Sequence, residues 1–205
     1  MTLKKLLLIA LVGTLCSFAS PVSASPLSGV EGLEFLRRAF AGVNDFTAEI
    51  TQEKQLSLMK KKMTASGTVR FRKPDTFYME LYSPYSSRVL LKDTVLTLKL
   101  PNEGVRQKIS LPREQGLGRW ISFLDRPVKS LPDGFDIRAE KRGETVFLQF
   151  APWKKGGMRE IQLSLSQDGR LKRLVLEENN RDRTVITFHR MKKNTGLTEG
   201  DFRLE

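Results

Sequence analysis

The stretch that decides the fold is Met63-Thr64-Ala65-Ser66-Gly67-Thr68-Val69-Arg70-Phe71-Arg72. Every second residue from Met63 to Phe71 is apolar or small, and the residues between them are polar or basic. A period of two is typical of a β-strand with one buried and one solvated face. The stretch therefore predicts a strand of an antiparallel sheet that faces water on one side.

The same alternation extends in both directions from this strand. It is present over residues 46–50 before the strand and over residues 77–81 after the turn at Pro74-Asp75. Further runs, separated by turn residues, follow almost to the end of the chain. We expect roughly ten or eleven strands in all, including a last piece near Phe202.

Two windows break this period and predict helices. Ser28 can cap a helix that runs from about Gly29 to Gly42. A second window, residues 117–124, has apolar residues at helical spacing, and Pro127 stops it. Residues 25–28, before the first helix, are expected to be a mobile start.

The sequence contains no internal repeat and no linker, which favours one domain. The expected fold class is mainly β (α+β): a single curved antiparallel sheet with roughly two or three short helices. A sheet of this length must curl or close, so its apolar face would line a concavity that the helices cover in part. Periodicity does not distinguish an apolar cavity from a fully packed core, and both remain open.

The N-terminus predicts export. Lys4 and Lys5 precede an uncharged, mostly apolar run, and Val22-Ser23-Ala24 offers small residues at a cleavage site. We expect residues 1–24 to be a signal peptide and residues 25–205 to form one periplasmic domain. The apolar run is shorter than the roughly 20 residues of a membrane-spanning helix. The only cysteine, Cys16, lies in the predicted signal peptide, so we expect no disulfide and no thiolate metal site.

The net charge of +12 favours anionic partners such as anionic lipid or acidic protein. Export argues against nucleic acid as a partner. The basic run Lys60-Lys61-Lys62 is expected to be a solvated hairpin tip, with docking to an anionic membrane as the alternative.

Catalytic signals are missing from the sequence. The only histidine, His189, is expected on the surface of a strand. There is no G-x-S-x-G motif, no P-loop and no G-x-G-x-x-G motif. We therefore expect no catalytic residue, no metal site and no cofactor, and the enzyme class is the weaker one.

One pattern in this chain resembles the periplasmic outer-membrane lipoprotein carrier family (LolA-like). The pattern is Phe46-Thr47-Ala48-Glu49-Ile50-Thr51-Gln52, then Gly67-Thr68-Val69, then Lys73-Pro74, and then Phe77 followed by Pro84. Residues 174–188 are similar to the closing hairpin of that family. The resemblance covers most of residues 25–205.

The resemblance implies a half-open β-barrel lidded by helices, whose apolar inside holds the acyl chains of lipoproteins. It also implies two partners, an inner-membrane ABC-type releasing complex and an outer-membrane acceptor. We expect the carrier itself to be a monomer. Residues expected to line the lipid-binding cavity, with plain core packing as the alternative, are Phe46, Phe71, Phe77, Met79, Leu81, Leu90 and Trp120.

Two departures from the family pattern bear on its function. Many members have Arg before the proline, where it is thought to latch the lid, and this chain has Lys73 there. A lysine makes a point contact rather than a bidentate one. Met79 stands where the family has a Trp, which leaves the cargo open. The alternatives are a carrier of another lipid, such as a glycolipid or polyene lipid, and a lipid-sensing regulatory protein with the same fold.

Overall fold

The computed structural model of this chain describes residues 24–59, 62–113, 116–153 and 157–204. The predicted signal peptide, except for Ala24, and part of the basic run at residues 60–62 lie outside the described residues.

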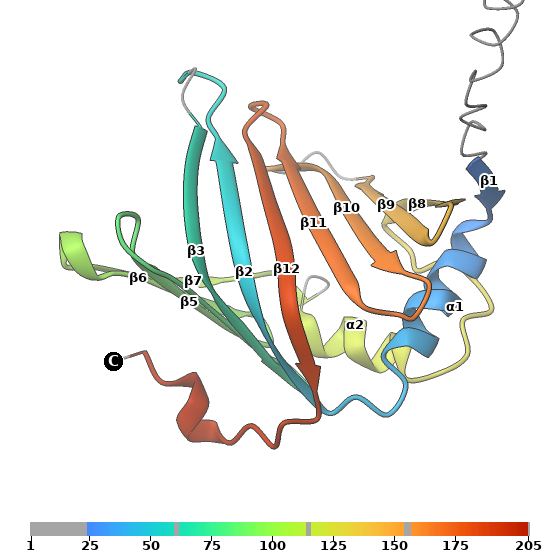
Figure 1. The fold of residues 1–205 in the computed structure, drawn as a ribbon, viewed down its shortest axis with the longest axis horizontal. Helices are drawn as coiled ribbons and strands as arrows, with labels where there is room; N and C mark the ends of the chain where they lie inside the picture. The colour runs from blue at the N-terminus through green and yellow to red at the C-terminus, as the bar shows by residue number, and fades with distance from the viewer. Residues whose placement is uncertain (1–23, 60–61, 114–115, 154–156, 205) are drawn as a thin grey trace, which may run out of the picture.

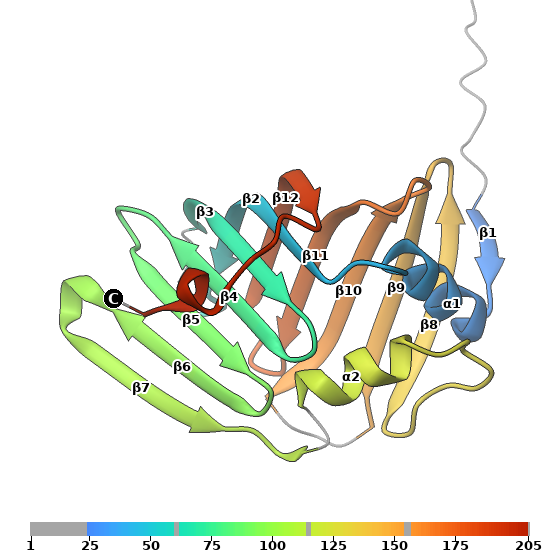
Figure 2. The same cartoon turned by 90° about the horizontal axis from the view of Figure 1, so that it is seen from below.

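The described residues form one antiparallel sheet of twelve strands in the order β1-β8-β9-β10-β11-β12-β2-β3-β4-β5-β6-β7. The sheet curves strongly, and β1 and β7 lie at opposite ends of the molecule, so it does not close (Figures 1 and 2). This confirms the predicted fold class. The strands are β1 (Ala24–Leu27), β2 (Asp45–Gln55), β3 (Lys62–Arg72), β4 (Thr76–Leu81), β5 (Ser87–Lys92), β6 (Val95–Leu100), β7 (Val105–Ser110), β8 (Phe135–Arg142), β9 (Thr145–Pro152), β10 (Met158–Ser166), β11 (Leu171–Glu178) and β12 (Arg183–Lys193).

Helix α1 (Gly29–Ala39) begins at the predicted cap. The Ser28 side chain accepts a hydrogen bond from the Glu31 backbone N–H, and the Ser28 backbone N–H donates to the Glu31 carboxylate, which satisfies two free donors. The helix packs tightly on β8 and β9, because a Cβ on Gly32 would lie 2.4 Å from the Cβ of Ala139. α1 therefore covers the β8 end of the sheet.

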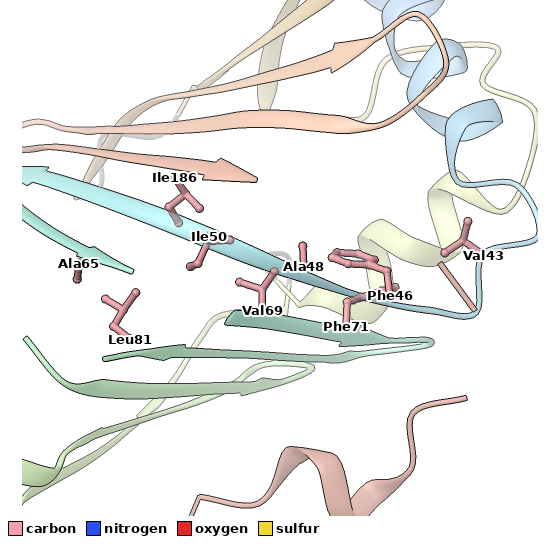
Figure 3. Close-up of a cluster of buried hydrophobic side chains, with 9 residues drawn as sticks. All are labelled: Val43, Phe46, Ala48, Ile50, Ala65, Val69, Phe71, Leu81 and Ile186. Carbon is pink, nitrogen blue, oxygen red and sulfur yellow. The ribbon is translucent and has the colours of Figure 1, made fainter. Parts of the chain in front are cut away.

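Two clusters of buried side chains form the core on the helix side of the sheet. The β2–β3 cluster, drawn in Figure 3, consists of Val43, Phe46, Ala48, Ile50, Ala65, Val69, Phe71, Leu81 and Ile186. The α1 cluster consists of Leu33, Leu36, Val128, Ile137, Val146, Leu148, Phe150 and Leu165. Helix α2 (Leu117–Leu124) contributes side chains to both clusters.

The structure differs from the sequence predictions at both ends of the domain. The predicted mobile start is wrong, because β1 pairs with β8 and Leu27 lies opposite Ala139. The predicted strand near Phe202 is also wrong, because this segment is a 3-10 helix, η3 (Glu199–Phe202). Thr198 caps η3 through Asp201, and this local bonding competes with a strand.

Candidate functional site: the apolar inner face of the sheet

The two faces of the sheet carry different side chains. We call the face against which α1 and α2 pack the inner face. Strand register aligns residues that share a face, because directly opposite residues in an antiparallel pair point to the same side. One inner row crosses six strands from β2 to β7, and every member is apolar: Phe46, Phe71, Phe77, Leu91, Leu96 and Ile109.

The neighbouring inner row is also apolar until the last strand. It runs through Ala48, Val69, Met79, Val89 and Leu98, and it ends at Gln107. The row behind it on the outer face is polar, and it runs through Thr68, Glu80, Arg88, Lys99 and Arg106. The two inner rows are thus suited to apolar ligands, and this outer row is suited to water.

The helices cover only part of the inner face. Leu117 and Ile121 of α2 pack on the β2–β3 cluster, which buries the middle of the sheet. Figure 2 shows β5, β6 and β7 extending beyond α2. The inner side chains there are half-buried or exposed, and Ile109 keeps 45% of its surface accessible. An open apolar strip therefore continues from under α2 to the edge of the sheet.

Polar contacts hold α2 at both ends. At its start, the backbone N–H of Leu117 donates to the Asp93 carbonyl, and that of Gly118 donates to the Asp93 carboxylate, both at 3.2 Å. At its end, Lys73 Nζ donates to Asp125 Oδ1 at 2.5 Å. The Lys73 side chain is 26% exposed and that of Asp125 is 53% exposed, so water reaches this ion pair.

The loop after α2 is tied to α1 by one carboxylate. Glu34 accepts hydrogen bonds from the Arg37 guanidinium at 2.7 Å and from the Val128 backbone N–H at 3.1 Å. The Arg37 hydrogen bond, followed by that from Val128, lowers the pKa of Glu34 to about 2. The contact holds the start of the α2–β8 connection against the first helix.

The structure brings most of the predicted cavity residues together. Phe46, Phe71 and Leu81 are buried in the β2–β3 cluster, and the Phe46 and Phe71 rings stack with centroids 5.3 Å apart. Phe77 and Met79 are half-buried beside that cluster. These five residues all lie on the inner face of β2 to β4.

Two predicted cavity residues lie elsewhere. Trp120 packs with the α1 cluster, and its ring meets those of Phe135 at 5.1 Å and Phe150 at 6.2 Å edge to face. Leu90 stands opposite Tyr78 and is therefore on the outer face. Leu91 takes the inner position that the sequence analysis assigned to Leu90.

The sequence analysis missed Leu91 and Asp125. Leu91 lies in a run of three apolar residues, Val89 to Leu91, where a period of two assigns no face. Asp125 has no sequence motif, because its partner Lys73 is 52 residues away and only the fold brings them together.

Two hollows of about 220 Å³ each lie outside the apolar strip. Glu80 and Arg88 line both of them, together with other polar groups. His189 is exposed on the outer face, with Nε2 3.2 Å from Thr51 Oγ1. Within the described ranges, no group of three or more His, Cys, Asp and Glu side chains could hold a metal ion. None of the described helices is both long enough and apolar enough to cross a bilayer.

Comparison with known proteins agrees with this architecture. The model of the family described as outer membrane lipoprotein carrier protein LolA matches residues 41–205. No curated protein sequence is similar enough to this chain to count as a match.

Several solved structures are similar to this chain at low sequence identity. An uncharacterized conserved protein from Thermus thermophilus is 13% identical, with 84% of this chain and 90% of that chain covered and a TM-score of 0.50. A LolA superfamily protein from Nitrosomonas europaea is 14% identical, with 86% and 98% covered and a TM-score of 0.47. The MucA/MucB complex of Pseudomonas aeruginosa contains a chain that is 14% identical, with 85% and 61% covered and a TM-score of 0.43. At 13% identity, the likeness to the Thermus thermophilus protein concerns the fold alone.

Proposed function

This chain belongs to the outer membrane lipoprotein carrier protein LolA family, and from that premise we propose that it is a periplasmic carrier of lipoproteins. In this proposal, the acyl chains of the lipoprotein bind to the apolar inner face. The observation that carries the proposal is the inner row from Phe46 to Ile109, which is apolar across six strands and left open beyond α2.

An acylated protein cannot cross an aqueous compartment unaided. Each buried CH₂ group of an acyl chain is worth about 0.8 kcal/mol, so a lipoprotein with several chains stays in its membrane without a carrier. The open strip offers the chains an apolar surface. Large exposed apolar patches are rare on soluble monomers and mark interaction sites.

Helix α2 is suited to act as a movable lid. Its Leu117 and Ile121 cover the inner row, and acyl chains could take the place of these side chains. The Lys73–Asp125 pair at its end is partly exposed, and such pairs contribute about 0–1 kcal/mol. Breaking this pair therefore costs little, and acyl chains that replace the contacts of Leu117 and Ile121 offset the loss of their packing. Cargo that binds only the open state shifts the equilibrium toward it.

The proposal includes an export step and two partners. Residues 1–24 would direct the chain to the periplasm and be removed. An inner-membrane ABC-type releasing complex would load the acyl chains, and an outer-membrane acceptor would receive them. No catalysis is required of the carrier, because neither step makes or breaks a covalent bond.

A release assay tests the proposal. The purified processed protein is added to spheroplasts, and the soluble fraction is analysed for acylated lipoprotein. A soluble complex at a one-to-one ratio is the expected result. If no lipoprotein is released but mass spectrometry finds a phospholipid, glycolipid or polyene lipid in the purified protein, the cargo is another lipid. If neither is found, the carrier function is wrong, and a sensor with this fold or a packed domain without cargo is left.

A further inference from the structure

Strand β7 is the last strand of the sheet and has one unpaired edge. Every residue from Val105 to Ser110 is exposed. Its side chains differ between the two faces. Val105 and Ile109 lie on the inner face opposite Leu100 and Leu96, and they are 37% and 45% exposed.

The outer face of β7 and its neighbour is cationic. Arg106 stands opposite Lys99, and Lys108 stands opposite Thr97. Among the described residues, none of the ion pairs involves Lys99, Arg106 or Lys108. Three cations of β6 and β7 thus lie on the outer face at this edge, and two exposed apolar side chains of β7 lie on the inner face.

We propose that the β7 edge contacts an anionic lipid surface. Val105 and Ile109 enter the boundary of the acyl region, and Lys99, Arg106 and Lys108 meet the headgroup phosphates. Long basic side chains can reach the headgroups while their stems lie along apolar groups. The unpaired backbone groups of the strand edge find hydrogen-bond partners in the wet headgroup region, which the hydrocarbon core could not offer.

The pairing of apolar and cationic side chains favours a bilayer over an acidic protein. An acidic protein would need only the three basic side chains for binding. Such a partner would leave Val105 and Ile109 exposed to water. A bilayer with anionic headgroups matches both faces of the strand. The proposed membrane contact is argued from residues of β6 and β7 alone. It does not require that the inner face holds cargo.

Vesicle co-sedimentation tests the contact. The processed protein, without cargo, is mixed with vesicles of phosphatidylcholine plus phosphatidylglycerol and with vesicles of phosphatidylcholine alone. We expect binding to the anionic vesicles only. The variant K99Q/R106Q/K108Q should bind them roughly 100-fold more weakly, because each basic residue near an anionic surface contributes about a factor of five.

A matched variant removes the same charge elsewhere. K129Q/K172Q/K192Q changes three exposed lysines on the α2–β8 loop, β11 and β12. The strands β2 to β6 separate β11 and β12 from β7. This control should retain most of the binding. If both variants lose vesicle binding equally, net charge alone explains the binding and the proposal is overturned. The proposal is also overturned if the wild-type protein binds neither kind of vesicle.

A second measurement does not rely on changes of charge. The variant I109C places a thiol on β7 for an environment-sensitive fluorophore. We expect a blue shift with anionic vesicles and none with phosphatidylcholine. Circular dichroism shows whether each variant is folded, and the single variants K99Q, R106Q and K108Q replace the triple variant if it is not. A lipoprotein release assay that fails while β7 binds vesicles would reject the carrier function alone.

Discussion

Leu90 and Leu91 are consecutive residues of β5, yet they face opposite sides of the sheet. Leu91 lies between Phe77 and Leu96 on the inner face, and Leu90 lies between Tyr78 and Thr97 on the outer face. Both side chains are half-buried. The same side chain therefore occurs at two adjacent positions, one on each face of the sheet.

This difference gives a direct test of the cargo face. We expect L91Q to weaken the binding of a fluorescent triacylated peptide by about tenfold, because burying a leucine side chain is worth about 1.5–3 kcal/mol and this one is already half-buried. L90Q, the matched control, should bind the peptide as the wild type does. Equal losses in the two variants would mean that the inner face is not where acyl chains bind.

The Lys73–Asp125 ion pair is expected to favour the closed position of α2 and to contribute little to the stability of the fold. A double-mutant cycle with K73L and D125N should give a coupling of about 0.2–1 kcal/mol in urea unfolding, the range of exposed pairs. Because the pair favours the closed, empty state, K73L should retain lipoprotein and unload it up to about fivefold more slowly.

Hydrogen exchange follows the lid directly. Hydrogen exchange of the α2 amides should become faster in K73L, while R138L, which removes the exposed Arg138–Asp136 pair of β8, should leave it unchanged. If K73L shows unchanged hydrogen exchange in α2 and unloads lipoprotein at the normal rate, Lys73 does not latch the lid.

Gly67 is expected to tolerate no side chain. A Cβ at this position of β3 would lie 2.0 Å from the carbonyl oxygen of Glu80 on β4, so the two strands would have to separate. We expect G67A to lower the free energy of unfolding by about 1–3 kcal/mol in urea. G157A is the control, because nothing lies within 4 Å of its added methyl group, and it should change stability by less than about 0.5 kcal/mol.

The Glu34 carboxylate predicts an acid-sensitive link between α1 and the loop after α2. Hydrogen bonds from Arg37 and Val128 lower its pKa from 4.5 to about 2. The unfolded chain therefore takes up the proton first as the pH falls. The stability from this group is complete above about pH 4.5 and is lost as the pH falls toward 2.

Unfolding curves across this pH range check the link. E34Q should lose less stability on acidification than the wild type does. E103Q changes an exposed carboxylate of the 3-10 helix η1 (Pro101–Glu103), between β6 and β7, and should follow the wild type. A wild-type curve that E34Q leaves unaltered would contradict the assigned role of Glu34.

The resemblance inferred from the sequence agrees with the family match over residues 41–205. The alternation around Val69, the capping pattern at Ser28 and the stop at Pro127 sufficed for the sheet and both α-helices, because these signals act within a few residues of the chain. They also placed Phe46, Phe71, Phe77 and Met79 on one face, since side-chain direction along a strand is local.

The sequence by itself determined the elements between α1 and β12 and the alternating faces of well-patterned strands, but not β1 or η3. Tertiary structure alone decided the face of Leu90, the cluster that Trp120 joins, the pairing of β1 with β8 and the partner of Lys73. Each of these depends on register or contact between segments far apart in the chain. Local propensity says little about such pairings, because they are fixed only when the whole sheet buries its apolar face.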